Sequence, residues 1–175
     1  MPEVWDIYDA NRNKTGKLAI RGVDLLKEGE YHIIVNAVII NSKNEILITK
    51  RAPHKKNPLL WECAGGSILA GETSLEGMLR ELKEELGLEL KKEEAIHFKE
   101  IKRNEVPPDI KDLWLFKKDI NIEDITFPDK EAIAAKWVTI DEFMKMYENK
   151  EIIKSIDFDS EDYNKVLNIL KNKNI

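Results

Sequence analysis

The chain of 175 residues has the length of one ordinary domain, and 42% of its residues are hydrophobic, which is enough for a substantial core. Its 28 basic and 33 acidic residues give a net charge of −5, and no apolar run approaches a membrane span, so neither a dedicated nucleic-acid binder nor a membrane protein is expected. The single cysteine, Cys63, excludes an internal disulfide, and the first residues form no signal-peptide core, so we expect a reducing, cytoplasmic location.

The first part of the chain is predicted to form strands. Val4–Tyr8 and Lys17–Ile20 flank a polar turn, which is the pattern of a β-hairpin. His32–Ile40 is nearly continuous apolar sequence, as expected for a strand that is buried on both faces. Four more segments have the composition of shorter strands: Glu45–Lys50, Phe98–Arg103, Leu113–Lys117 and Ala134–Val138.

Residues 73–86 have the pattern of an amphipathic helix. Thr73 is a suitable N-cap, and Glu76 three residues later completes a capping box. Gly87 can adopt the left-handed conformation that ends a helix. Apolar side chains recur at helical spacing along the segment, at Leu75, Met78, Leu79, Leu82 and Leu86. We therefore expect this helix to pack on a core through its leucine face.

Two further helices are predicted near the C-terminus. Thr139 and Glu142 form a second capping box ahead of apolar residues at helical spacing. Ser160 is the candidate N-cap of a last helix at about residues 160–172. Strands before, between and after helices favour a mixed sheet that is covered on both sides.

Three acidic residues stand within five positions of the predicted helix 73–86. Glu81, Glu84 and Glu85 project from neighbouring positions, because residues three or four apart share one helix face. An acidic run alone is more often a solvated helix face. Carboxylate oxygens are also the ligands that Mg²⁺ and Mn²⁺ prefer, and such ions bridge proteins to substrate phosphates. The cluster therefore suggests a metal site for a phosphate chain.

The acidic residues belong to a longer pattern that runs from Gly66 to Leu88, G-x5-E-x7-R-E-L-x-E-E-x-G-L. This pattern resembles the Nudix box at every defined position. Nudix enzymes typically hydrolyse a nucleoside diphosphate linked to another moiety. The resemblance covers about residues 30–150 of a single domain, 1–175, and implies an α/β/α sandwich with a mixed β-sheet. The predicted N-terminal hairpin, in residues 1–29, lies outside this part.

The resemblance implies roles for the residues of the box. Glu81 and Glu85 are expected to be the principal ligands of Mg²⁺ or Mn²⁺. Glu84 is expected to be a further ligand or the residue that activates water. Arg80 and Glu72 are expected to form an ion pair that holds the preceding loop to the helix, which places Arg80 in the catalytic machinery.

Further positions are candidates for the same site. The carbonyl group of Gly66 is a possible metal ligand, and Glu131 stands where many Nudix enzymes carry an additional metal-binding or base glutamate. Asp112 is a second candidate of this kind. Gly77 departs from good helix sequence, because alanine would favour the helix by about 1 kcal/mol, and we expect close packing there.

A basic segment, residues 50–58, precedes the box. Arg51 and Lys55 are candidate contacts of the diphosphate oxygens. The alternative is a solvated loop between strands. Three further side chains are expected to have structural or surface positions: a hydrogen-bonded His32, an exposed His54 and a core Trp61.

A second resemblance concerns the substrate. The sequences WDIYDANRNKTG and KRAPHKKNPLLWE are similar to the Nudix subgroup related to isopentenyl-diphosphate isomerases. Those isomerases use a cysteine next to the first glycine of the box and a histidine just after it. The corresponding run here is Gly65-Gly66-Ser67, and Cys63 stands two residues too early with no adjacent base. The sequence therefore predicts an isomerase relative with a hydrolase site.

The leading interpretation is a metal-dependent diphosphohydrolase that acts on a small, nucleotide-linked diphosphate. Two alternatives from other classes stay open: an isopentenyl-diphosphate isomerase, and a catalytically silent module that binds a nucleotide or a protein partner. The complete acidic set argues against the silent module, because binding alone does not need three metal carboxylates. The sequence specifies neither the leaving group nor the oligomeric state.

Overall fold

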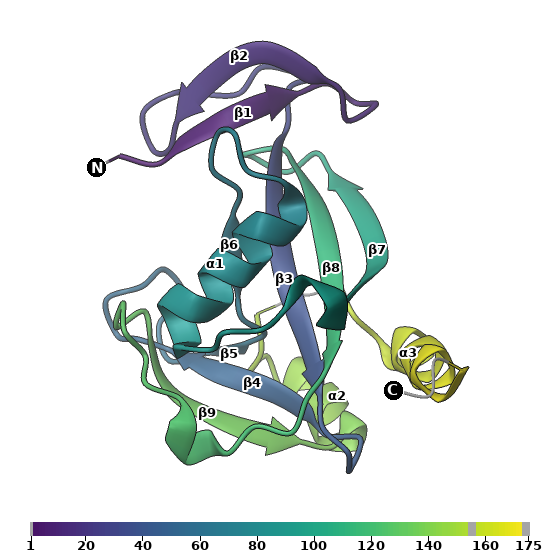
Figure 1. Cartoon of the computed structure of the whole chain (residues 1–175). Coiled ribbons are helices and arrows are strands. Elements are labelled where there is room, and N and C mark those ends of the chain that lie inside the picture. Colours follow the sequence, from purple (N-terminus) through teal and green to yellow (C-terminus); the bar gives the residue numbers. More distant parts are fainter. Residues whose placement is uncertain (1, 154–156, 173–175) are drawn as a thin grey trace.

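The computed structural model describes residues 2–153 and 157–172 (Figure 1). Two antiparallel strands, β1 (Val4–Tyr8) and β2 (Lys14–Ile20), form the predicted hairpin at the top of Figure 1. The other strands of the described residues are β3 (His32–Ile40), β4 (Ile46–Arg51), β5 (Trp61–Glu62), β6 (Gly65–Ser67), β7 (Ala95–Arg103), β8 (Asp109–Lys117) and β9 (Ala132–Val138). They form one sheet with the order β5-β4-β3-β8-β7, in which β6 also pairs with β3 and β9 with β4.

The sheet is mixed and has helices on both faces. β3 and β8 run parallel, whereas the other pairs are antiparallel. Helix α1 (Ser74–Leu86) packs on one face, and α2 (Ile140–Glu148) and α3 (Ser160–Asn172) lie on the other (Figure 1). Short 3₁₀ turns occupy residues 92–94 and 122–124. This architecture confirms the predicted α/β/α sandwich with an N-terminal hairpin. No helix within the described ranges is long and apolar enough to cross a membrane.

Side chains of β3 alternate between two cores, as the continuous apolar sequence predicted. The core under α1 includes Ile33, Val35, Ala37, Ile39, Met78, Leu82 and Leu86. The core under α2 and α3 includes Val38, Ile40, Leu115, Phe143, Val166 and Leu170. Full burial of one such large side chain stabilises the fold by roughly 1.5–3 kcal/mol. The core under α1 therefore fixes this helix on the central strand β3 and on β6.

The hairpin is attached to the start of β3 and to the loop before α1. The backbone groups of Tyr8 and Tyr31 exchange two N–H···O bonds of 2.8 and 2.9 Å. The N–H of Ala70 donates to the carbonyl of Val4 at 2.8 Å. These backbone bonds hold the hairpin beside the N-terminal end of α1 (Figure 1).

Several predicted boundaries differ from the structure. β7 begins three residues before the predicted Phe98, and β8 begins four residues before Leu113. Ser160 is the first residue of α3 rather than its cap, so that prediction is wrong. The carboxylate of Asp159 accepts the N–H of Asp162 at 2.9 Å, which makes Asp159 the N-cap. The short strands β5 and β6 were not predicted, because two or three residues carry no periodic signal.

Candidate active site

Both ends of α1 have the caps that the sequence predicted. Thr73 Oγ1 accepts the N–H of Glu76 at 3.3 Å, and the Glu76 carboxylate accepts the N–H of Thr73 at 3.0 Å. Gly87 has a φ of +69° and donates its N–H to the carbonyl of Lys83 at 3.0 Å. The N–H of Leu88 donates to a carbonyl one residue earlier in the helix. The helix that carries the acidic residues is therefore closed at each end.

Two glycines allow the loop before α1 to approach the helix. A Cβ atom added to Gly66 would overlap the carboxylate of Glu81. A Cβ atom added to Gly77 would overlap the terminal methyl group of Ile68, which confirms the predicted close packing at this position. Gly66 thereby places its backbone directly beside an acidic side chain of the box.

Arg80 connects the loop to the acidic face of α1. Its Nε and Nη2 donate to Glu72 at 2.8 and 3.1 Å, and Nη2 also donates to the carbonyl of Ser67 at 2.9 Å. The structure therefore contains the ion pair that the family resemblance implies. Nη1 donates to Glu81 at 2.8 Å and to Glu84 at 2.9 Å. Arg80 thus balances the charge of two predicted metal ligands.

Glu85 is the most buried carboxylate of the box. Its side chain accepts the N–H of Gly65 at 3.0 Å, and the residue is only 7% exposed. Burial, followed by the negative charges of Glu62 and Glu81, raises the pKa of Glu85 well above its ordinary value. Burial is also the main cause of a raised pKa at Glu81, whereas the side chain of Glu84 is 53% exposed. A cation beside Glu85 would relieve this unfavourable concentration of charge.

The loop of residues 126–131 is held against the C-terminal end of α1. The N–H of Thr126 donates to the carbonyl of Leu86 at 3.3 Å, and the N–H of Asp129 donates to the carbonyl of Glu84 at 3.2 Å. The last carbonyls of a helix have no partner within the helix, so they are available to such a loop. These two bonds bring acidic side chains of the loop to Glu85.

Carboxylates from α1 and from this loop converge. One oxygen each of Glu85, Asp129 and Glu131 lies within 4.8 Å of the others. Burial raises the pKa of Asp129, and Lys55 forms an ion pair with Glu131. A set of carboxylate oxygens at this separation suits a hard divalent cation such as Mg²⁺ or Mn²⁺. Sequence reasoning did not select Asp129, although its Oδ1 accepts the N–H of Glu131 at 2.8 Å, a local turn that the two-residue spacing could have suggested.

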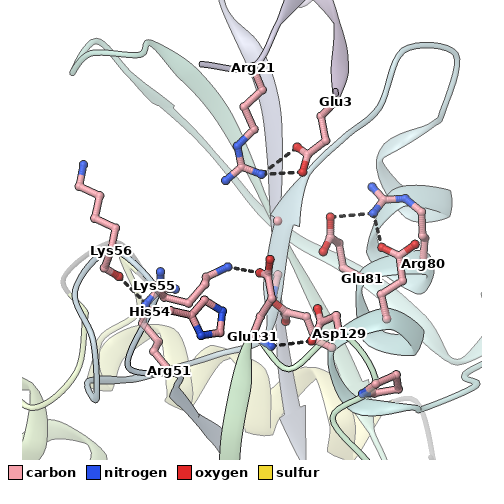
Figure 2. A pocket seen from close by; sticks show the side chains of 15 residues that line it. Glu3, Arg21, Arg51, His54, Lys55, Lys56, Arg80, Glu81, Asp129 and Glu131 are labelled. Atoms are coloured by element: carbon pink, nitrogen blue, oxygen red, sulfur yellow. Dashed lines mark hydrogen bonds and ion pairs between the residues drawn. The ribbon is translucent and has the colours of Figure 1, made fainter. Parts of the chain in front are cut away.

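The converging carboxylates lie in a cleft of about 900 Å³ (Figure 2). Figure 2 shows α1 with Arg80 and Glu81 on one side, the loop with Asp129 and Glu131 below, and basic side chains opposite. The residues that line the cleft are Glu3, Arg21, Arg51, His54, Lys55, Lys56, Gly65, Gly66, Arg80, Glu81, Glu84, Glu85, Pro128, Asp129 and Glu131. The cleft therefore contains every residue that the sequence proposed for metal or phosphate binding, except Asp112.

The two predicted phosphate contacts have acidic partners in the structure. Arg51 Nη1 donates to both carboxylate oxygens of Glu62, at 2.8 and 2.6 Å, and Nε donates to the carbonyl of Lys56 at 2.8 Å. Lys55 pairs with Glu131, and burial followed by the charge of Arg51 lowers its pKa. Both cations thus reach the cleft, and Lys55 contacts a candidate metal ligand directly.

Comparisons with known proteins identify the family. The sequence model of the NUDIX domain matches residues 30–157. The chain belongs to the Nudix family. An uncharacterised Nudix hydrolase of Listeria monocytogenes is 35% identical over 158 residues, which cover 86% of this chain and 88% of that protein. Nudix hydrolases cleave nucleoside diphosphates linked to another moiety, so the chain is a pyrophosphohydrolase.

Two solved structures have the same fold. A protein of Deinococcus radiodurans has a TM-score of 0.70 and 21% identity, and the match covers 87% of this chain and 93% of that one. A bifunctional NMN adenylyltransferase/ADP ribose pyrophosphatase of Francisella tularensis, complexed with AMP and an Mn ion, has a TM-score of 0.55 and 22% identity over 82% of this chain and 42% of that one. These relatives give no support to the predicted isomerase-like subgroup.

The candidate role of Asp112 in this Nudix site is wrong. Asp112 is fully buried outside the cleft, where Arg12 Nη1 donates to it at 2.7 Å and His97 Nε2 lies 3.0 Å away. Burial favours its neutral form, yet hydrogen bonds from Arg12, Ser74 and His97 outweigh burial and lower its pKa. Asp112 is therefore already paired with the guanidinium of Arg12, and this pair anchors the hairpin to the sheet.

The remaining predictions concern side chains around the Nudix box. Cys63 is fully buried in the core under α2 and α3, and burial raises its pKa to about 12, as an inert thiol requires. Trp61 packs against the same core, and His54 is exposed, as predicted.

His32 is buried and stacks on Trp5, but its Nδ1 has no hydrogen-bond partner among the described residues. The expectation of a hydrogen-bonded imidazole is therefore wrong for Nδ1.

Proposed function

We propose that this chain is a metal-dependent diphosphohydrolase that cleaves a phosphoanhydride bond in a nucleoside diphosphate linked to another moiety. The convergence of Glu85, Asp129 and Glu131 carries the proposal, because two segments far apart in sequence bring oxygen ligands to one place. Basic side chains border the same cleft, as a bound diphosphate requires. We also propose a small-molecule substrate and a cytoplasmic location, the latter because Cys63 is a free thiol.

The donor set fits Mg²⁺ or Mn²⁺. The ligands that we propose are the carboxylates of Glu81, Glu84, Glu85, Asp129 and Glu131 and the carbonyl of Gly66, all of which line the cleft. When bound, such an ion neutralises the diphosphate and lowers the pKa of a coordinated water. Glu85 supports this assignment most strongly, because a buried carboxylate near two others needs a cation for balance. The Francisella neighbour was solved in complex with an Mn ion, which supports Mn²⁺ as a candidate metal for this chain.

Other tasks fall to the side chains of the cleft. A carboxylate must accept the proton of the attacking water, and Glu84 suits this task because its side chain is half exposed at the cleft. Glu131 is the second candidate base, on the opposite wall. Arg80 is a positioning residue, because it holds Glu81 and Glu84 through one nitrogen. Lys55 and Arg51 are the proposed contacts of the diphosphate oxygens.

The two alternative functions are not favoured. An isomerase needs an acid and a base at the reacting carbon, and Gly65 and Ser67 supply neither thiol nor imidazole. Cys63 cannot substitute, because it lies in the core under α2 and α3 with a pKa of about 12. A silent binding module would not need the five carboxylates that we propose as ligands in one cleft.

A substrate screen tests the proposal. Nucleoside-diphosphate-linked compounds are incubated with Mg²⁺, Mn²⁺ or a chelator, and release of phosphate, pyrophosphate or nucleotide is measured. We expect hydrolysis of at least one compound that stops when the metal is removed. Deuterium exchange from D₂O into isopentenyl diphosphate is measured in parallel, and we expect none. Exchange that disappears in Cys63→Ala would overturn the hydrolase assignment.

A further inference from the structure

The N-terminal hairpin contributes a wall to the cleft. Glu3, just before β1, and Arg21, just after β2, both line it. Figure 2 shows the two side chains extending from the hairpin toward the carboxylates of the cleft. The NUDIX domain match begins at residue 30, so this wall comes from a segment outside the matched family domain. The hairpin is therefore a part of the chain that could determine which substrates the chain prefers.

Arg21 has hydrogen-bond donors available in the cleft. Its Nη1 donates to both carboxylate oxygens of Glu3 at 2.8 Å, and its backbone N–H donates to the Glu3 carbonyl at 3.0 Å. Nε and Nη2 make no hydrogen bond with any residue of the described ranges, and the side chain is 53% exposed. A guanidinium presents five donors in a planar fork that matches phosphate oxygens. Arg21 can therefore keep Glu3 and bind an anion as well.

The hairpin holds Arg21 in a fixed place. Besides the backbone bonds of Tyr8 and Tyr31, the Trp5 ring stacks on His32 with 4.0 Å between the ring centroids. The carboxylate of Asp6 accepts the N–H of Gly71, in the loop before α1, at 2.8 Å. A group that is already positioned loses less conformational entropy on binding. The hairpin thus acts as a rigid support for Arg21.

The chemistry of the cleft indicates what it binds. None of the 15 described residues that line it is Phe, Tyr or Trp, so no large aromatic side chain is placed to stack on a base. Besides Arg80 of α1, basic side chains reach it from two segments: Arg21 follows β2 of the hairpin, and Arg51, Lys55 and Lys56 stand at the end of β4 and in the loop after it. The positive charges therefore converge on one volume from both sides.

We infer that Arg21 binds a phosphate of the substrate beyond the diphosphate that is cleaved, so that the substrate class is a compound with three or more phosphates in one chain. This inference rests on the proposed function, because it takes the cleft as the diphosphate site. A single diphosphate would occupy the region between α1 and residues 51–56 and would leave Arg21 with Glu3 as its only anionic partner. One additional phosphate would reach the donors of Arg21.

Binding of two inorganic probes tests this inference. The dissociation constants of diphosphate and tripolyphosphate are measured by calorimetry with Ca²⁺, for the full chain and for Arg21→Gln. We expect the wild type to bind tripolyphosphate more tightly than diphosphate. In Arg21→Gln, affinity for tripolyphosphate should fall about tenfold, as for a lost charged hydrogen bond, and that for diphosphate should change less than about twofold.

Lys17→Gln is the matched control. Lys17 is on the same hairpin, forms an ion pair with Glu30 at 2.6 Å and does not line the cleft, so this variant removes the same charge from elsewhere. It should leave both affinities unchanged. Arg21→Lys keeps the charge without the planar fork and should give an intermediate loss. It also provides the test if Arg21→Gln does not fold.

The outcomes separate this inference from the proposed function. A wild type without preference for tripolyphosphate, or an Arg21→Gln variant that weakens both probes equally or neither, overturns the role of Arg21. That result would not contradict the proposed function, which hydrolysis in the substrate screen tests separately. Conversely, selective loss of tripolyphosphate binding in Arg21→Gln supports the phosphate site even if the screen finds no hydrolysis, in which case only the proposed reaction fails.

Discussion

Two cationic side chains of the protein itself balance three of the carboxylates that we propose as metal ligands. Arg80 donates to Glu81 and Glu84, and Lys55 pairs with Glu131. Among the described residues, Glu85 accepts a hydrogen bond only from the N–H of Gly65, and it is the most buried carboxylate of the box. At the residue scale, the charge of Glu85 is therefore the one that contributes least to the stability of the fold and most to the binding of a cation.

Glu85→Gln separates these two roles. The substitution removes a buried charge but keeps an oxygen that can accept the N–H of Gly65. We expect turnover to fall by roughly two or more orders of magnitude, while the free energy of unfolding in metal-free buffer stays equal or rises. Both are measured together, by hydrolysis and by urea denaturation. The control is Glu89→Gln, an exposed partner of Lys83 just after α1, which should change neither. Wild-type turnover in Glu85→Gln would refute the metal mechanism.

Lys55 competes with the metal for Glu131 if the proposed site is right. Lys55→Gln removes a positive charge from beside a candidate ligand. We expect Mn²⁺ to bind about twofold to fivefold more tightly in this variant, since a partly exposed ion pair contributes about 1 kcal/mol or less. The Michaelis constant should rise, because the same amine is the proposed phosphate contact. Calorimetric titration with Mn²⁺ measures the first effect, and unchanged metal affinity would place the ion outside the reach of Lys55.

At the scale of single elements, the sequence predicted α1 well because its determinants are local. The caps at Thr73 and Gly87 and the leucine stripe lie within one short segment. β8 was predicted too short, because Lys111 and Asp112 interrupt its apolar sequence. Both are fully buried, since Lys111 pairs with Asp157 at 2.9 Å and Asp112 with Arg12. Their partners are distant in sequence, so no local pattern could reveal them.

The same limit applies to the candidate site. The clustering of the acidic residues of the box could be predicted from the sequence, because helical spacing determines which residues share a face. Asp129 reaches Glu85 only because its loop satisfies carbonyl groups at the end of α1. Arg21 reaches the cleft only because the hairpin docks beside β3. Tertiary contacts, rather than local propensity, decide these two positions.

Gly77→Ala tests how tightly α1 packs on its loop. Helix propensity alone predicts a gain of about 1 kcal/mol, whereas the structure places an added methyl group into Ile68. We expect packing to win and the variant to lose roughly 1–3 kcal/mol of unfolding free energy. Ile68→Val removes the overlapping methyl group, so the double variant should recover part of the loss relative to the sum of the single changes. If urea denaturation shows that Gly77→Ala is more stable than the wild type, the loop that carries Ile68 moves to accommodate the added methyl group.

At the scale of the whole molecule, the docked hairpin completes the cleft. The contacts that join it to the core include the pair of Arg12 with Asp112, the backbone pair of Tyr8 with Tyr31, and the stack of Trp5 on His32. The ring nitrogens Trp5 Nε1 and His32 Nδ1 are buried without a hydrogen-bond partner among the described residues. Protonation of His32 would therefore place an uncompensated charge in the joint that positions Arg21.

Acid should weaken this joint within a defined pH range. Burial, followed by the positive charges of Arg21 and Arg103, lowers the pKa of His32 from 6.5 to about 4, against a smaller opposing effect of Glu3. Between these two values the unfolded chain binds the proton and the folded chain does not. The contribution of His32 to stability is therefore complete above pH 6.5 and is lost as the pH falls toward 4. The total loss is about 3 kcal/mol, at 1.36 kcal/mol per pKa unit.

His32→Phe isolates this effect, because a phenyl ring can stack on Trp5 but cannot take up a proton. Acidic side chains also titrate below pH 5, so the informative quantity is the difference in unfolding free energy between the variant and the wild type. That difference should shift in favour of the variant by about 3 kcal/mol as the pH falls from 7 to 4. A direct NMR titration of the His32 imidazole in the wild type checks the cause even if the larger ring is not tolerated. An imidazole that titrates near 6.5 in the folded protein would show that the hairpin joint is open to water, and the pH dependence of the difference would then vanish.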